Sequence, residues 1–395
     1  MVKGECGWRL GLAALIIGTL PSCTYSPGSP LRTLPETTQP HLVALTADEC
    51  RAVVHDDAPV ESLRQAAARS LDYVEKLPSK QTKVFDRSVS AADVQTVLDA
   101  VVAATNSADW PGAVCDHLRL YRAELPAPLL VTGYYQPELP ASRERTERFR
   151  YPLYRTPSDL VDVDLGQFCS GCAGHTAHGR VQDGKLVPYY SRAEIDAGAL
   201  AGRDDELAWL DDPVEAFFLH VQGSALLRFD DGVHMEISYS SSNGRPYSSL
   251  GRVLIEQGKM TRDTVSLMAL KDYLHTHADE QAALMATNPR YIFFRTVVVG
   301  PIGSVGVPLT GGRSIAADAS VYPPGALAFL RIDPRDQQSV SRPVPTFARF
   351  AVIQDAGTAI TGPSRIDVFW GTGANAESIA GDMRNPGELY LVFPE

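Results

Sequence analysis

The C-terminal part of the chain, from Tyr291 onward, alternates short apolar segments with glycine- and proline-rich turns. Its turns are PIGS (301–304), TGGR (310–313), YPPG (322–325) and TGPS (361–364). Such turns punctuate the apolar segments and divide them into short strands, and a series of short strands favours a closed or nearly closed β-structure. The sequence therefore predicts a small β-barrel in this region.

The region before the barrel mixes helices and strands. Apolar residues recur at helical spacing in VESLRQAAARSLDYVEKL (60–77) and in SAADVQTVLDAVVAAT (90–105), where Ser90 is the expected N-cap. A β-rich region begins at LLVTGYYQPEL (129–139). The segment 217–239 is predicted to form strands, broken at Gln222-Gly223-Ser224 and at the turn 230–232, and further helices are expected between 247 and 287.

Two carboxylates interrupt apolar strands in QDAGTAITGPSRIDVFWGTG (354–373). Asp367 lies in RIDVFW, where alternation would turn Ile366 and Val368 to a core and Asp367 and Phe369 to a groove. Asp355 precedes Ala-Gly, which is typical of a turn. Either the acids are solvated, or one of them performs chemistry.

Charge and the N-terminus restrict location and partners. The formal net charge of −11 argues against a nucleic-acid partner, which would need a basic face. Residues 1–23 read as a signal peptide, because the apolar run 10–20 is too short to span a bilayer. The residues before Cys23 resemble a bacterial lipobox, which would place a lipid on Cys23; the alternative is a plain secretory signal. Residues 24–42, rich in Pro, Ser and Thr, are typical of a tether.

Export would place the remaining cysteines in an oxidising compartment. The simplest pairing joins Cys50 to Cys115 and Cys169 to Cys172, but three connectivities are possible. In CSGCAGHTAHG (169–179) the two cysteines and two histidines could instead bind Zn²⁺. Zinc sites usually separate their ligand pairs by a longer segment, so a disulfide is preferred here and no metal is expected.

Several segments in order resemble the membrane-bound lytic murein transglycosylase A family. They are TGYYQP, YPLYRTPSDL, YYSRAEIDAGAL, VQGSALLRF, NGRPYSSLGRVLIEQG, NPRYIFFR, GGRSIAADASVYPPG and the 354–373 segment quoted above. The resemblance implies a mainly β fold with N-terminal and inserted helices. A double-psi β-barrel would carry a three-aspartate motif, here Asp318, Asp355 and Asp367, and a second β-domain would be inserted, with a groove between the two.

The expected domain order follows from the resemblance. The N-terminal helices and the first part of the barrel would occupy 43–139, the inserted β-domain with its helices 140–289, and the rest of the double-psi barrel 290–395. The protein would be periplasmic and anchored by lipid to the outer membrane.

The implied activity is that of a peptidoglycan lytic exotransglycosylase, a carbon–oxygen lyase that needs no cofactor. It would cleave the MurNAc–GlcNAc β-1,4 bond of peptidoglycan strands and leave 1,6-anhydro-MurNAc ends. Asp367 would be the single general acid/base, Asp355 its neighbour, and Asp318 a structural residue. The expected substrate-binding residues are Thr132, Gly133, Tyr134, Gln222, Gly223, Ser224 and Phe369.

Two other functions stay open at this point. The chain could be a weakly active peptidoglycan-binding or scaffolding protein of the same fold, or a muramidase that uses both carboxylates to hydrolyse the bond. Complexes with cell-wall synthesis or division proteins are compatible with the activity, but no segment of the sequence encodes one.

Overall fold

In the computed structural model, which describes residues 39–77, 81–172, 175–332, 347–381 and 383–394, the C-terminal apolar segments close into a barrel. Among these residues, six strands form the ring in the order β19-β16-β17-β15-β18-β5, and β5 pairs back onto β19. The strands are β5 (Leu129–Gln136), β15 (Ser314–Ala316), β16 (Leu327–Ile332), β17 (Phe347–Asp355), β18 (Arg365–Thr372) and β19 (Arg384–Pro394). The predicted small barrel is confirmed.

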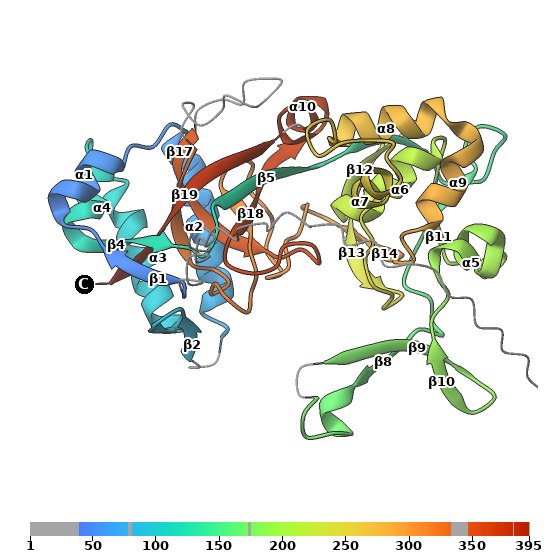
Figure 1. The fold of residues 1–395 in the computed structure, drawn as a ribbon, viewed down its shortest axis with the longest axis horizontal. Helices are drawn as coiled ribbons and strands as arrows, with labels where there is room; N and C mark the ends of the chain where they lie inside the picture. The colour runs from blue at the N-terminus through green and yellow to red at the C-terminus, as the bar shows by residue number, and fades with distance from the viewer. Residues whose placement is uncertain (1–38, 78–80, 173–174, 333–346, 382, 395) are drawn as a thin grey trace, which may run out of the picture. The chain divides into compact units, whose positions relative to one another are not determined.

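Strand β5 comes from a part of the chain far from the other barrel strands. It pairs in parallel with β18 and antiparallel with β19, and it leads directly into β6 of a second sheet. Figure 1 shows β5 running from the barrel strands toward the inserted α6 and β12. The barrel and the inserted sheet are therefore joined through one continuous stretch of chain.

The inserted sheet has the strand order β14-β13-β12-β6-β11-β7. Its strands are β6 (Glu138–Ser142), β7 (Tyr151–Tyr154), β11 (Glu206–Leu210), β12 (Ser224–Phe229), β13 (His234–Ser242) and β14 (Ile292–Val297). The helices of this region are α5 (Arg192–Glu194), α6 (Pro213–Gln222), α7 (Leu250–Glu256), α8 (Leu267–Thr276) and α9 (Ala278–Ala286). β14 pairs with β13, although the domain bounds expected from the sequence put 290 onward with the barrel.

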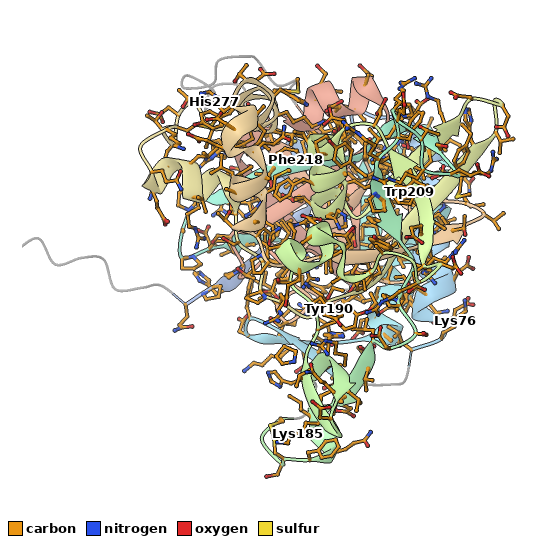
Figure 2. The ribbon with its side chains drawn as sticks, turned by 90° about the vertical axis from the view of Figure 1, so that its right-hand side faces the viewer. Lys76, Lys185, Tyr190, Trp209, Phe218 and His277 are labelled. Carbon is orange, nitrogen blue, oxygen red and sulfur yellow. A yellow bond between two sulfur atoms is a disulfide. The ribbon has the colours of Figure 1, made fainter. Side chains whose placement is uncertain are left out.

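The remaining elements frame these two sheets. A small sheet consists of β8 (Val161–Asp164), β9 (Thr176–Gln182) and β10 (Lys185–Pro188), and Figure 2 labels Lys185 at its β9–β10 end. The N-terminal elements are β1 (His41–Ala44), α1 (Ala47–Val53), α2 (Val60–Val74), β2 (Gln81–Val84), β3 (Arg87–Ser90), α3 (Ala91–Ala104), α4 (Trp110–His117) and β4 (Leu118–Glu124). β4 extends the barrel by pairing with β19, and β1 pairs with β4.

The helices predicted at 60–77 and 90–105 are confirmed as α2 and α3. Ser90 caps α3, because its hydroxyl accepts a hydrogen bond from the Asp93 amide. One strand prediction is wrong: residues 217–222 belong to α6. Asp212 caps that helix, Pro213 occupies its first turn and Gly223 ends it with φ of 89°, so local capping chemistry overrides an apolar run that resembles a strand.

A second helix was also missed. α10 (Ala374–Gly381) lies in the region predicted to be nearly all strand. Its residues are small and polar enough to read as a loop, and it packs against β5 and β18. None of the helices in the described ranges is both long and apolar enough to cross a lipid bilayer. The predicted signal peptide, Cys23 and most of the tether lie outside the described residues.

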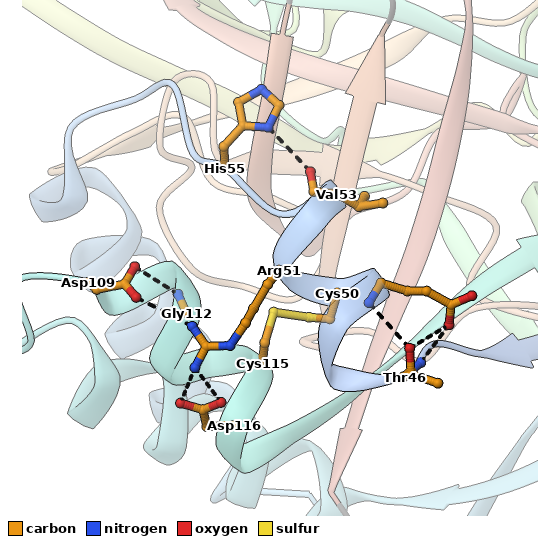
Figure 3. Close-up of a disulfide and its surroundings, with 10 residues drawn as sticks. Thr46, Cys50, Arg51, Val53, His55, Asp109, Gly112, Cys115 and Asp116 are labelled. Carbon is orange, nitrogen blue, oxygen red and sulfur yellow. Dashed lines mark hydrogen bonds and ion pairs between the residues drawn. A yellow bond between two sulfur atoms is a disulfide. The ribbon is translucent and has the colours of Figure 1, made fainter.

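Both preferred cysteine pairs are disulfides in the structure. Cys50 of α1 is bonded to Cys115 of α4 and closes a separation of 65 residues, and Arg51 pairs with Asp116 beside it (Figure 3). Cys169 is bonded to Cys172. The zinc alternative needs both of those thiolates, so it is not the arrangement observed.

An ion cluster around the buried Lys271 joins the inserted helices to the barrel. The ammonium of Lys271 (α8) lies 2.8 Å from Glu215 (α6) and 2.6 Å from Glu377 (α10). Glu377 also accepts a hydrogen bond from the hydroxyl of Tyr135 (β5). The insert therefore contacts the barrel through a buried ammonium group that is paired with two partly buried carboxylates.

A second buried ion pair fixes the N-terminal segment to the barrel. Arg313 and Asp56 are both fully buried and form a two-pronged contact of 2.7 and 2.8 Å. The same guanidinium donates to the carbonyl oxygen of Phe350, and the Phe350 amide donates to Asp56. Such a network is stable only when every member is present.

We therefore predict that Asp56→Ala lowers the free energy of unfolding by about 3–5 kcal/mol, because it leaves the Arg313 charge buried and unpaired. Asp57→Ala is the matched control. Asp57 is 30% exposed and pairs with Arg349, so its loss should cost about 1 kcal/mol. Urea unfolding of both variants measures the difference, and equal losses would contradict this account of the pair.

Candidate functional site

A cavity of about 590 Å³ opens between the barrel and the inserted sheet. Its walls come from β5, β17 and β18 of the barrel, from β12, β13 and β14 of the insert, and from the segment 301–306. Of the residues expected in the site, it brings together Asp355, Asp367, Tyr134, Gln222, Gly223 and Ser224. A volume of this size is typical of a small-ligand site.

Asp367 lies on β18 directly beside Thr132 of β5. The two residues are register partners in a parallel pair, so their side chains leave the sheet on the same face. Asp367 Oδ1 and Thr132 Oγ1 are both buried, and neither has a hydrogen-bond partner among the described residues. Thr132 itself lies beside the cavity wall rather than in it. Buried polar atoms are rarely left unpaired, and such pairs of atoms are candidates for contact with a ligand.

The environment of Asp367 favours its protonated form. Burial raises the pKa of the Asp367 carboxyl from 3.8 to about 6; Arg365 acts in the opposite direction, and the charge of Asp355 adds to the increase. The closest Arg365 nitrogen is 3.8 Å from Asp367 Oδ1, which is too far for a hydrogen bond. The pairing with Arg365 that would make Asp367 merely structural is therefore weak.

Asp355 sits at the end of β17 and is held in a different way. Its Oδ1 accepts hydrogen bonds of 2.9 Å from the amides of Ser304 and Ala356, and its Oδ2 accepts one of 2.8 Å from the hydroxyl of Tyr134. Burial raises the pKa of Asp355, and these hydrogen bonds offset part of that increase. The two acids thus share a cavity but differ in support: donors stabilise the anion of Asp355, whereas Asp367 Oδ1 has none in the described part of the chain.

The structure places Phe369 differently from the expectation. The alternation of β18 was expected to turn Phe369 to the groove beside Asp367, but its side chain is only 2% exposed and does not line the cavity. The ring of Tyr134 packs against it, with centroids 5.3 Å apart. Phe369 therefore packs against the ring of Tyr134 and does not contact the cavity.

Gly133 also has a packing role in place of the expected contact with a saccharide. A Cβ at this position would lie 2.8 Å from the Ala380 backbone and 2.9 Å from the Trp370 ring. Glycine is required because α10 and Trp370 approach the strand closely. The side chains that β5 supplies near the cavity are those of its neighbours, Thr132 and Tyr134.

The Gln222-Gly223-Ser224 segment reaches the cavity through a helix end. Gln222 is the last residue of α6, and its side-chain oxygen accepts a hydrogen bond from the Tyr135 amide. Gly223 has φ of 89° and follows the last residue of α6, so it is a helix-ending glycine. Ser224 begins β12, and its side chain is almost fully buried.

Asp318 lies outside the cavity lining. It accepts hydrogen bonds from the amide and hydroxyl of Ser320 and from the Gly362 amide. Burial acts to raise the pKa of Asp318, but these donors outweigh it and the pKa is lowered. The geometry supports the expectation that Asp318 holds loops together.

Several cavity residues were not singled out from the sequence. They are His220, Tyr239, Ser240, Arg290, Arg295 and the 301–306 segment. From the sequence, NPRYIFFR contributes only to the family resemblance, and PIGS only indicates a turn. Nothing in their local pattern reveals that β14 and the following loop fold against β17.

The arrangement suits proton transfer to a bound ligand. A carboxyl group with a pKa near 6 can both donate and accept a proton near neutral pH. Across the described ranges, no group of three or more His, Cys, Asp and Glu side chains is arranged to hold a metal ion.

Comparison with known proteins gives consistent matches. The model of the MltA specific insert domain matches residues 130–295, and that of the 3D domain matches residues 313–393. The chain is 31% identical over 264 residues to the membrane-bound lytic murein transglycosylase A of Escherichia coli (strain K12). The match covers 66% of this chain and 64% of that relative's length.

Solved structures agree over a longer range. A membrane-bound lytic murein transglycosylase from Agrobacterium tumefaciens superposes with a TM-score of 0.76 at 30% identity, covering 89% of this chain and 97% of that one. MltA from Neisseria gonorrhoeae gives a TM-score of 0.71 at 26% identity, covering 90% and 93%. The likeness includes both the barrel and the inserted sheet.

The raised pKa of Asp367 generates a stability prediction. Its folded-state pKa lies above the unfolded value, so its ionisation destabilises the fold increasingly as the pH rises through about 6, by roughly 2–3 kcal/mol when complete. Asp367→Asn should therefore raise the free energy of unfolding by roughly 2 kcal/mol at pH 8 and change it little at pH 4.

Asp318→Asn provides the contrast, because its lowered pKa means that the anion stabilises the fold. This variant should lose stability at pH 8 and less at low pH. Denaturant unfolding at the two pH values tests both changes. A loss of stability at pH 8 in Asp367→Asn would contradict the environment described for Asp367.

Proposed function

Because the chain belongs to the membrane-bound lytic murein transglycosylase A family, we propose that it cleaves the MurNAc–GlcNAc bond of peptidoglycan with Asp367 as general acid and base. One observation carries this proposal: a buried carboxyl group in a cavity, with a pKa of about 6 and without a hydrogen-bond partner for Oδ1 among the described residues. A surface aspartate is solvated and a structural one is hydrogen-bonded, whereas a buried carboxyl group with a raised pKa and an unpaired oxygen is typical of a functional site.

The reaction needs only one acid when the nucleophile is part of the substrate. Protonated Asp367 gives its proton to the bridging glycosidic oxygen as the bond to C1 breaks. The resulting carboxylate then takes the proton of the C6 hydroxyl while that oxygen bonds to C1 of the same sugar. The 1,6-anhydro ring forms, and Asp367 ends in its starting state. Tethering of the nucleophile replaces a second catalytic carboxylate.

Asp355 has a supporting role in this proposal. Its negative charge raises the proton affinity of Asp367, and its hydrogen bonds to Tyr134 and Ser304 keep it in position. An anion in the cavity also stabilises the positive charge that develops on the sugar ring in the transition state. Gln222 and Ser224, which line the cavity, would hydrogen-bond the saccharide, and Thr132 would support Asp367 from the neighbouring strand.

The family also supports a proposal for the location. The relatives are named membrane-bound, and the N-terminal sequence contains a lipobox-like segment ending at Cys23. We propose a periplasmic enzyme whose lipid on Cys23 keeps it at the outer membrane, with residues 24–42 as the tether. Its partner is the peptidoglycan strand.

The roles of the two acids can be separated by kinetics. Asp367→Ala should reduce kcat by about 10²–10⁴, the range of general acid–base catalysis. Asp355→Asn should reduce activity less. It should also move the alkaline limit of kcat/KM, expected near pH 6 in the wild type, to lower pH, because a charge that raises the pKa of Asp367 is gone.

The activities of the wild type, Asp367→Ala and Asp355→Asn are measured across the pH range as the rate at which a suspension of purified peptidoglycan loses turbidity. Equal losses at Asp367 and Asp355, with no shift of the pH limit, would indicate a two-carboxylate hydrolase. Full activity in Asp367→Ala would contradict the proposed catalytic role.

A further inference from the structure

The wall of the cavity that the insert contributes carries two arginines, Arg290 and Arg295. Arg290 immediately precedes β14, and Arg295 lies on it. Neither guanidinium has an ion pair or a hydrogen bond to another residue in the described ranges, whereas Arg228 of the same sheet is paired with Glu138. The acids lining this cavity are Asp355 and Asp367 on the barrel side.

The backbone of Arg290 is fixed by buried groups. Its carbonyl oxygen accepts a 2.8 Å hydrogen bond from Arg192, which is 3% exposed, and its amide donates to the side chain of Asn288. Arg192 also donates to the Asn288 carbonyl oxygen, and Asn243 donates to that of Pro289. The segment 288–290 is therefore held in place before any ligand arrives.

Arg295 is also placed by regular structure. It pairs with Ser238 in the β13–β14 ladder, and its side chain is exposed. A rigid strand that presents a free guanidinium to a cavity is suited to an anion, since the planar fork of arginine matches the two oxygens of a carboxylate. The chain as a whole carries a net charge of −11, so any attraction of this cavity for an anion must come from local cations such as these two arginines.

We propose that Arg290 and Arg295 form an anion subsite that binds a carboxylate on the muramic acid side of the glycan strand. This inference rests on the proposed function and adds a basis for selectivity to it. Muramic acid carries a lactyl group that ends either in a free carboxylate or in a stem peptide with its own carboxylates. GlcNAc carries neither, so the subsite distinguishes peptidoglycan from an uncharged glycan such as chitin.

Binding measurements on the full chain test the subsite. All proteins carry Asp367→Asn, so that strands are not cleaved. The ligands are peptide-bearing glycan strands, strands stripped of peptides by an amidase so that lactyl carboxylates are free, and chitohexaose, which has no carboxylate. Arg290→Gln/Arg295→Gln is compared with Arg290→Lys/Arg295→Lys and with Arg228→Gln, an exposed arginine that does not line the cavity.

The glutamine pair should weaken binding of a carboxylate-bearing strand about tenfold and leave chitohexaose unchanged. The lysine pair should recover part of the loss, and Arg228→Gln should show none. Added salt should weaken the strand binding of the protein with both arginines more than that of the glutamine pair. Loss with stripped strands alone identifies the lactyl carboxylate, and loss with peptide-bearing strands alone identifies the stem peptide.

Two results would overturn the subsite. One is an equal loss of affinity for chitohexaose, which would mean that the arginines shape the cavity for any glycan. The other is unchanged affinity for both kinds of strand. Because binding is measured without cleavage, a wild-type chain that fails to cleave peptidoglycan would contradict the proposed function and leave this test readable.

Discussion

The parallel pairing of β5 with β18 is the constraint on which the site depends. It brings together segments more than two hundred residues apart, and it sets Thr132 beside Asp367. The same strand closes the barrel through β19 and places Tyr134 within 2.8 Å of Asp355. Because β5 then continues into the inserted sheet, the register that positions the acids also positions the opposite wall of the cavity. A slip of one residue would turn every one of these side chains to the other face.

Burial of Asp367 shows how stability and function oppose each other in this protein. The fold provides the neighbouring Asp355 with hydrogen-bond donors, yet gives Asp367 Oδ1 no partner among the described residues. Elsewhere in the fold, buried charged groups have ion-pair partners: Arg313 pairs with Asp56, and Lys271 pairs with Glu215. Those ion pairs hold the N-terminal segment and the insert against the barrel. The surrounding structure is therefore rigid enough to keep the Asp367 carboxyl buried without a hydrogen-bond partner for Oδ1 among the described residues.

Much of the architecture could be predicted from local signals. The turns PIGS to TGPS predict the barrel, Ser90 predicts the start of α3, and the family resemblance locates both acids. The errors come from chemistry that depends on distant partners or on caps. Residues 217–222 resemble a strand, but Asp212, Pro213 and Gly223 make them part of a helix. Gly133 and Phe369 lie on the predicted strands, but α10 and Tyr134, which determine their roles, come from other parts of the chain. Arg290 and Arg295 could not be predicted as site residues, because they line the cavity only once the insert has packed opposite the barrel.

The most direct test of the account is mass spectrometry of the fragments that the purified full-length protein releases from peptidoglycan. A single acid with a tethered nucleophile predicts fragments ending in 1,6-anhydro-MurNAc, each lighter by one water than the hydrolysis product. Fragments ending in reducing MurNAc would contradict it, because water would then be the nucleophile and Asp355 would have to activate it.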